Sequence, residues 1–80
     1  MDNTLGKNIL FHRKRLGMTQ DQLAEKLGVT AQAVSKWEND LSCPDITTIP
    51  KLAAIFGITT DSLLTGQPED PVREKLSLIR

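Results

Sequence analysis

The stretch that decides the fold is residues 28–40, GVTAQAVSKWEND. Thr30 can cap a helix that runs to about residue 39, because its hydroxyl can accept a hydrogen bond from an amide of the first turn. One face of this helix is apolar and holds Ala33, Val34 and Trp37. The other face is small and polar, with a single cation, and holds Ala31, Gln32, Ser35 and Lys36. The apolar face predicts packing into a core, whereas the polar face needs a functional explanation.

The composition favours one small domain. The chain has 80 residues, of which 39% are apolar, so a small continuous core is feasible. A single cysteine, Cys43, cannot form an internal disulfide, and a single histidine, His12, leaves no set of zinc ligands. We therefore expect a reduced, cytoplasmic setting and no metal or cofactor. No apolar run is long enough for a membrane span or a signal peptide.

Charge is distributed unevenly, although the formal net charge is zero. Residues 7–36 hold six basic residues and two acidic ones, whereas residues 37–80 hold four basic and seven acidic residues. Zero net charge argues against a non-specific polycation. It does not exclude DNA binding, because the local distribution of charge matters more than the sum.

Apolar spacing and capping residues predict five short helices and no strand. The first carries Leu5, Ile9, Leu10 and Leu16 and stops at Gly17. A capping box begins the second, with Thr19 at the cap and Gln22 three residues later. Its apolar residues are Leu23, Ala24 and Leu27. The fourth runs over residues 47–56 with Thr47 as its cap and Pro50 in its first turn, where a missing amide costs nothing.

Residues 1–66 form the predicted domain, whose fifth helix is capped by Thr59 or Thr60 and holds Leu63 and Leu64. Residues 67–80 form a linker followed by a short C-terminal helix or tail. In that segment Asp70 can cap a sixth helix that starts at Pro71. Its apolar stripe is Val72, Leu76 and Ile79. This stripe fits a dimer contact and packing on the domain's own core equally well.

The second and third helices are joined by so short a turn that they must cross steeply. Ala24 supplies the small residue at the crossing, and Gly28 suits a turn that requires positive φ. Val34 and Trp37 are the apolar anchors of the third helix. Together these features predict a helix-turn-helix, in which the third helix presents its outer face to the DNA major groove.

Residues 19–38, TQDQLAEKLGVTAQAVSKWE, resemble the helix-turn-helix of the phage-repressor and Cro class, also called the xenobiotic-response-element family of bacterial regulators. The resemblance covers about residues 5–66. It includes Arg13, residues 16–20, Pro44, residues 52–53, residues 56–58 and residues 61–64. It implies an all-α, five-helix, lambda-repressor-like DNA-binding domain, with a possible short sixth helix.

The resemblance also implies roles for individual residues. Gln20 matches a glutamine that hydrogen-bonds a DNA phosphate, and Asn39 matches a position that meets the DNA backbone. The residues expected to face base edges are Ala31, Gln32, Ser35 and Lys36. Gln32 could pair with adenine, and Lys36 could reach guanine or a phosphate. Arg13 and Glu38 match a pair that often forms a partly buried salt bridge. The structural positions of the motif are Ala24, Gly28, Val34 and Trp37.

The loop at residues 40–45, DLSCPD, departs from the pattern because it lacks the basic residues that some phage repressors place on phosphates. Asp40 and Asp45 would repel the DNA backbone if they faced it. Phosphate contacts would then come from backbone amides, Ser42, Thr47 or Thr48.

The sequence predicts a double-stranded-DNA-binding transcriptional regulator, a repressor, that acts as a homodimer on a palindromic operator. The alternative is a protein-interaction module or an antitoxin built on a helix-turn-helix scaffold, which the neutral charge and the acidic loop favour. We predict no enzymatic activity and no small-molecule ligand, because no nucleophile, base and orienting group can be assembled. His12 and Cys43 are interpreted as incidental.

Overall fold

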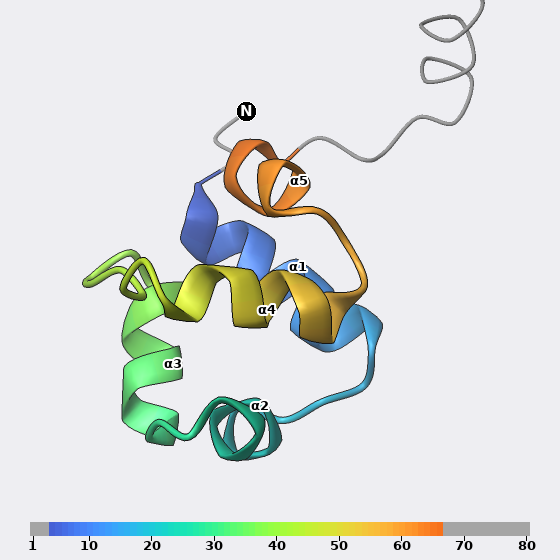
Figure 1. Ribbon diagram of the computed structural model, residues 1–80. Coiled ribbons are helices and arrows are strands. Elements are labelled where there is room, and N and C mark those ends of the chain that lie inside the picture. The colour runs from blue at the N-terminus through green and yellow to red at the C-terminus, as the bar shows by residue number, and fades with distance from the viewer. Residues whose placement is uncertain (1–3, 67–80) are drawn as a thin grey trace, which may run out of the picture.

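The computed structural model describes residues 4–66, which form five α-helices and contain no β-strand (Figure 1). The helices are α1 Leu5–Arg15, α2 Gln20–Leu27, α3 Ala31–Glu38, α4 Thr48–Phe56 and α5 Thr60–Thr65. The predicted all-α, five-helix architecture is therefore confirmed. The predicted linker and sixth helix, with Val72, Leu76 and Ile79, lie outside the described residues. No helix within residues 4–66 is long and apolar enough to cross a membrane.

Threonine hydroxyls cap four of the five helices. The side chains of Thr4, Thr19, Thr30 and Thr59 each accept a hydrogen bond from the backbone amide three residues later. At Thr19 the capping box is complete, because the Gln22 side chain also accepts from the Thr19 amide at 2.9 Å. These bonds satisfy amides that have no partner inside the helix. The predicted starts of α2 and α3 are confirmed.

The cap of α4 differs from the prediction. Thr47 occupies the N-cap position, but its backbone is already helical and its side chain makes no capping bond. Asp45 takes the role instead. One of its carboxylate oxygens accepts from the Thr48 amide at 2.9 Å and from the Thr47 and Thr48 hydroxyls at 2.8 and 2.7 Å. These hydrogen bonds lower the pKa of the Asp45 carboxyl. A carboxylate here also meets the positive end of the helix dipole.

The core lies where all five helices meet. Its buried apolar side chains are Ile9, Leu23, Ala24, Leu27, Val34, Trp37, Leu52, Ala53, Phe56 and Leu63. Helix α4 packs against α1, α2 and α5, and α1 packs against α3 and α5. Figure 1 shows α2 and α3 together at one end of the molecule and α5 at the other. Leu16, expected in the apolar stripe of α1, follows the end of the helix and is 42% exposed.

Helix α1 approaches α3 closely at Gly6. A methyl group placed on Gly6 would overlap the backbone oxygen of Trp37 and a carboxylate oxygen of Asp40. Asp40 is held there because it adopts a left-handed backbone, with φ of 59°, and accepts a hydrogen bond from the Thr4 hydroxyl at 3.0 Å. The contact explains why a poor helix former occupies the first turn of α1.

We expect Gly6→Ala to lower the free energy of unfolding by about 1–3 kcal/mol, because overpacking against a backbone oxygen forces the helices apart. This loss outweighs the gain of about 1 kcal/mol that alanine brings to a helix. Urea unfolding measures it. Lys7→Ala, at the exposed neighbouring position, is the control and should change the stability by no more than about 0.5 kcal/mol. A Gly6→Ala variant more stable than the wild type would contradict the close approach.

His12 and Arg15 join α1 to the end of α4, although the sequence predicts only an incidental role for His12. The His12 ring stacks on Phe56 with centroids 5.3 Å apart. Arg15 donates from Nε to His12 Nδ1 at 3.2 Å and from Nη2 to the Phe56 carbonyl at 2.9 Å. Burial and the neighbouring Arg15 charge lower the pKa of His12 below its usual 6.5.

This pKa shift predicts a pH-dependent stability. The folded domain favours the neutral imidazole, so the unfolded chain binds a proton more readily. The contribution of His12 to stability should therefore be fully present above pH 6.5. It should decline as the pH falls through 6.5 toward the pKa of His12 in the folded domain. Thermal unfolding between about pH 7.5 and about pH 5.5 measures the decline. His12→Phe retains a ring against Phe56 without the titration, so its stability should vary less over this range. An equal decline in the stability of the wild type and of His12→Phe would show that a group other than His12 causes the pH dependence.

Candidate nucleic-acid interface

Helices α2 and α3 form the predicted helix-turn-helix. They are joined by residues 28–30, where Gly28 adopts the left-handed conformation with φ of 74°. Ala24 is buried where the helices meet, and its carbonyl accepts from the Val29 amide at 3.0 Å. Val34 and Trp37 are buried on the inner face of α3. This packing fixes the direction in which the outer face of α3 points.

The outer face of α3 is not uniformly open. Gln32 and Lys36, one helical turn apart, are exposed. Ala31 and Ser35 are half-buried, and Ala31 packs against the edge of the core. The four side chains share the predicted face, but only Gln32 and Lys36 combine reach, hydrogen-bonding groups and exposure. They are the candidates for contacts with base edges.

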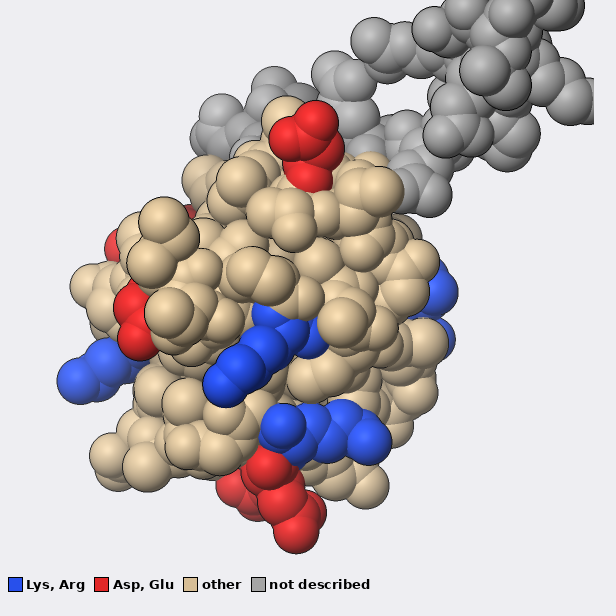
Figure 2. Space-filling model, in the orientation of Figure 1, with Lys and Arg blue, Asp and Glu red and all other residues tan. Residues whose placement is uncertain are grey.

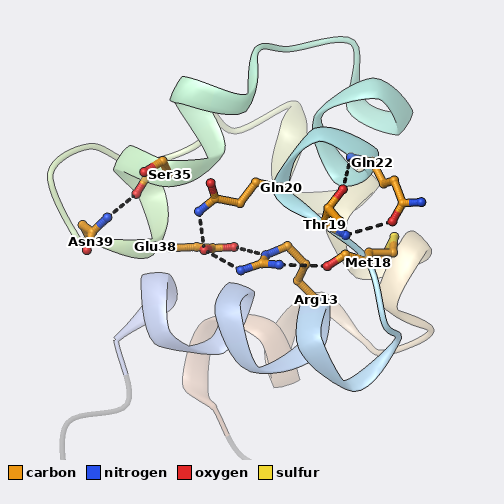
Figure 3. Close-up of polar contacts among 8 residues, drawn as sticks. All are labelled: Arg13, Met18, Thr19, Gln20, Gln22, Ser35, Glu38 and Asn39. Carbon is orange, nitrogen blue, oxygen red and sulfur yellow. Dashed lines mark hydrogen bonds and ion pairs between the residues drawn. The ribbon is translucent and has the colours of Figure 1, made fainter.

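Glu38 connects three segments of the interface (Figure 3). Arg13 donates from Nε to Glu38 Oε2 at 2.6 Å and from Nη2 to Oε1 at 3.1 Å. The exposed fractions of the two side chains are 11% for Arg13 and 4% for Glu38, so the salt bridge is largely shielded from water. Arg13 Nη1 also donates to the Met18 carbonyl at 2.8 Å. The ion pair implied by the resemblance is present and ties α1 to both α3 and the start of α2.

Gln20 belongs to the same network. Its Nε2 donates to Glu38 Oε1 at 3.0 Å, so the side chain expected on a phosphate also has a partner within the protein. Nothing in the sequence pattern indicated this bond, because it joins residues on different helices. Contact of Gln20 with DNA stays a prediction.

Asn39 closes the end of α3. Its Nδ2 donates to the Ser35 carbonyl at 2.8 Å, which satisfies a carbonyl of the last turn. The side chain is exposed, and within residues 4–66 the Ser35 carbonyl is its one hydrogen-bond partner. Its predicted contact with the DNA backbone is compatible with this position.

Pairing within the fold neutralises one basic side chain of residues 7–36, whereas Arg15, Asp40 and Asp45 are hydrogen-bonded but keep their charge. Arg13 is bound to Glu38, and Arg15 is bound to the end of α4. In the acidic loop, Asp40 and Asp45 bind threonine hydroxyls of the protein. On the face drawn in Figure 2, basic side chains lie among uncharged ones, and near the lower edge one of them lies directly against acidic atoms. Within residues 4–66, no group of three or more His, Cys, Asp or Glu side chains could hold a metal.

Known proteins are similar to this chain over the helix-turn-helix and the helices around it. A family model described as Helix-turn-helix matches residues 12–63. The HTH-type transcriptional regulator ImmR of Bacillus subtilis (strain 168) is 34% identical over 76 residues, which are 95% of this chain and 59% of ImmR. The chain thus spans less than two thirds of that relative.

Two solved structures of DNA complexes are similar to the fold. The P22 c2 repressor, in complex with a synthetic operator, is 29% identical with a TM-score of 0.78. The match covers 82% of this chain and all of that one. SinR, a master regulator for biofilm formation, in complex with DNA, is 31% identical with a TM-score of 0.69. That match covers 75% of this chain and 97% of the SinR chain in that structure.

Proposed function

This chain belongs to the helix-turn-helix family of Cro/C1-type regulators, and we propose that it is a sequence-specific regulator of transcription that binds double-stranded DNA. The observation that carries the proposal is the geometry of α3. Its inner face is fixed by Val34 and Trp37, and its outer face offers Gln32 and Lys36 to a groove. The similarity to the P22 c2 repressor and to the master regulator SinR, both solved in complex with DNA, supports the same function.

In this proposal α3 lies in the major groove. Gln32 pairs with an adenine, and Lys36 reaches guanine acceptors or a phosphate. Ala31 and Ser35 allow close approach, because their side chains are small and half-buried. Asn39 and the start of α2 meet the DNA backbone, where the positive end of the helix dipole favours an anion.

We propose further that the protein acts as a homodimer on a palindromic operator and represses transcription in the cytoplasm. One such domain reads only a few base pairs, so useful specificity requires two copies. In the proposed division, residues 1–66 bind DNA and residues 67–80 contribute to a dimer contact. Leu64, on α5 at the end of the described chain, is 45% exposed and is an apolar candidate for that contact.

The alternative is a protein-interaction module or antitoxin that uses the same scaffold. The observation in its favour is the loop between α3 and α4, which carries Asp40 and Asp45 but no basic residue. Two acidic side chains beside α3 weaken attraction to phosphates, even though both are hydrogen-bonded within the protein.

A salt series separates the two functions. Sites selected from random DNA are bound by the protein at increasing salt, and log affinity is plotted against log salt concentration. A regulator that neutralises several phosphates gives a steep negative slope, roughly −0.9 for each phosphate contacted. Failure to enrich any site, or affinity independent of salt, would reject DNA binding and favour the interaction module.

Gln32→Ala should weaken binding to the selected site by about 1–3 kcal/mol and relax base preference at one position, because a bidentate contact to a base is lost. Site selection repeated with the variant measures both effects. Since Gln32 is exposed and makes no core contact, unfolding of the free variant should match the wild type. Unchanged specificity would remove Gln32 from the base-reading residues.

A further inference from the structure

We propose that Glu38, which is buried and cannot touch DNA, is a positioning residue for the DNA contact made by Gln20. The proposal rests on the proposed DNA-binding function and concerns how one contact of that interface is prepared. Its basis is the hydrogen bond from Gln20 Nε2 to Glu38 Oε1, which joins the start of α2 to the end of α3.

The Glu38 carboxylate fixes which way the Gln20 amide faces. A carboxylate only accepts hydrogen bonds, so it pairs with the amide nitrogen and repels the amide oxygen. Rotating the Gln20 amide by half a turn would place its oxygen against Glu38 Oε1. Figure 3 shows the nitrogen of Gln20 directed at Glu38 and the oxygen turned away. The amide therefore has one preferred orientation.

Glu38 itself is held in place by Arg13. Two nitrogens of Arg13 bind its two oxygens, at 2.6 and 3.1 Å, and the Glu38 side chain is 4% exposed. Arg13 also holds the Met18 carbonyl, directly before the Thr19 cap of α2. The backbone at the start of α2 and the side chain of Gln20 are thus held by the same ion pair.

Gln20 keeps hydrogen-bonding groups that it can offer to DNA. One N–H of its Nε2 is used on Glu38, which leaves the second N–H for a phosphate oxygen and the carbonyl oxygen for a donor. The side chain is half-buried and already ordered, so binding does not have to restrict its rotamers. Glu38 thereby favours the DNA contact without making one.

A double-mutant cycle tests the coupling. Affinity for the selected site is measured for the wild type, Glu38→Gln, Gln20→Ala and the double variant. A glutamine at 38 has one accepting oxygen to share between Arg13 and Gln20, so we expect Glu38→Gln to weaken binding roughly tenfold. In the Gln20→Ala background the same change should have little effect. Equal weakening in both backgrounds would overturn the proposal, because Glu38 would then act only through general stability.

Gln32→Ala provides the matched background. Gln32 lies on the outer face of α3 and has no hydrogen bond to Glu38 among the described contacts, so Glu38→Gln should weaken binding in that background as much as in the wild type. If Glu38→Gln also failed to weaken binding in the Gln32→Ala background, any weakened interface would hide its effect. That result would contradict a specific link between Glu38 and Gln20.

A measurement on the free wild type keeps the proposal testable even if Glu38→Gln does not fold. The side-chain NH₂ groups of Gln20 and Gln32 are compared by NMR. One proton of Gln20 should be shifted downfield and exchange more slowly than the protons of exposed Gln32. Indistinguishable behaviour would overturn the proposal. Absence of salt-dependent DNA binding by the wild type would reject the proposed function instead, whatever the NMR comparison shows.

Discussion

Trp37→Ala is expected to lower the free energy of unfolding by about 3–5 kcal/mol. Trp37 is 6% exposed and packs in the core from the inner face of α3, and its backbone oxygen lies against Gly6 of α1. A small domain is stabilised by little more than about 5 kcal/mol, so the loss should leave much of the variant unfolded at physiological temperature. DNA binding should fail with it, because α3 loses its support.

Far-ultraviolet circular dichroism is the suitable measurement, since Trp37 is the single tryptophan of a chain without tyrosine and its removal abolishes that fluorescence signal. Gln32→Ala, on the opposite face of the same helix, is the control and should unfold within about 0.5 kcal/mol of the wild type. A Trp37→Ala variant with the wild-type melting temperature would refute the assignment of Trp37 to the core.

The helices could be predicted because their signals are local. Thr19, Thr30 and Gly28 lie within a few residues of the amides and carbonyls that they satisfy, so spacing alone locates the ends of α2 and α3. The sequence predicts Thr47 as the cap of α4, whereas Asp45 makes the capping bonds. An acid two residues earlier can reach the same amide, and the sequence pattern does not decide between the two.

The candidate interface could be predicted only in part, for a different reason. Helical periodicity places Gln32 and Lys36 on the outer face of α3, and the structure exposes both. The bond from Gln20 to Glu38 and the close approach at Gly6 depend on how helices distant in sequence cross. For the close approach, the sequence offers one signal, the glycine at position 6 near the start of a helix.

Arg13→Ala is expected to destabilise the domain as strongly as the loss of Trp37, by about 3–5 kcal/mol, because it leaves a buried carboxylate without its cation. Glu38 would retain only the bond from Gln20, and the Met18 carbonyl would lose its donor. Water cannot take the place of Arg13 at either group without opening the contacts among α1, α2 and α3. Urea unfolding at neutral pH measures the loss.

A volume-matched apolar pair separates this cost from the value of the salt bridge itself. Arg13→Met combined with Glu38→Leu removes both charges together, so no buried charge is stranded, and replacements of this kind are often neutral or stabilising. The double variant should therefore be more stable than Arg13→Ala, while its DNA affinity should fall because Gln20 loses its acceptor. An Arg13→Ala variant as stable as the wild type would show that water reaches Glu38 freely. A double variant with full DNA affinity would show that Gln20 needs no support from Glu38, and the ion pair would then serve the fold alone.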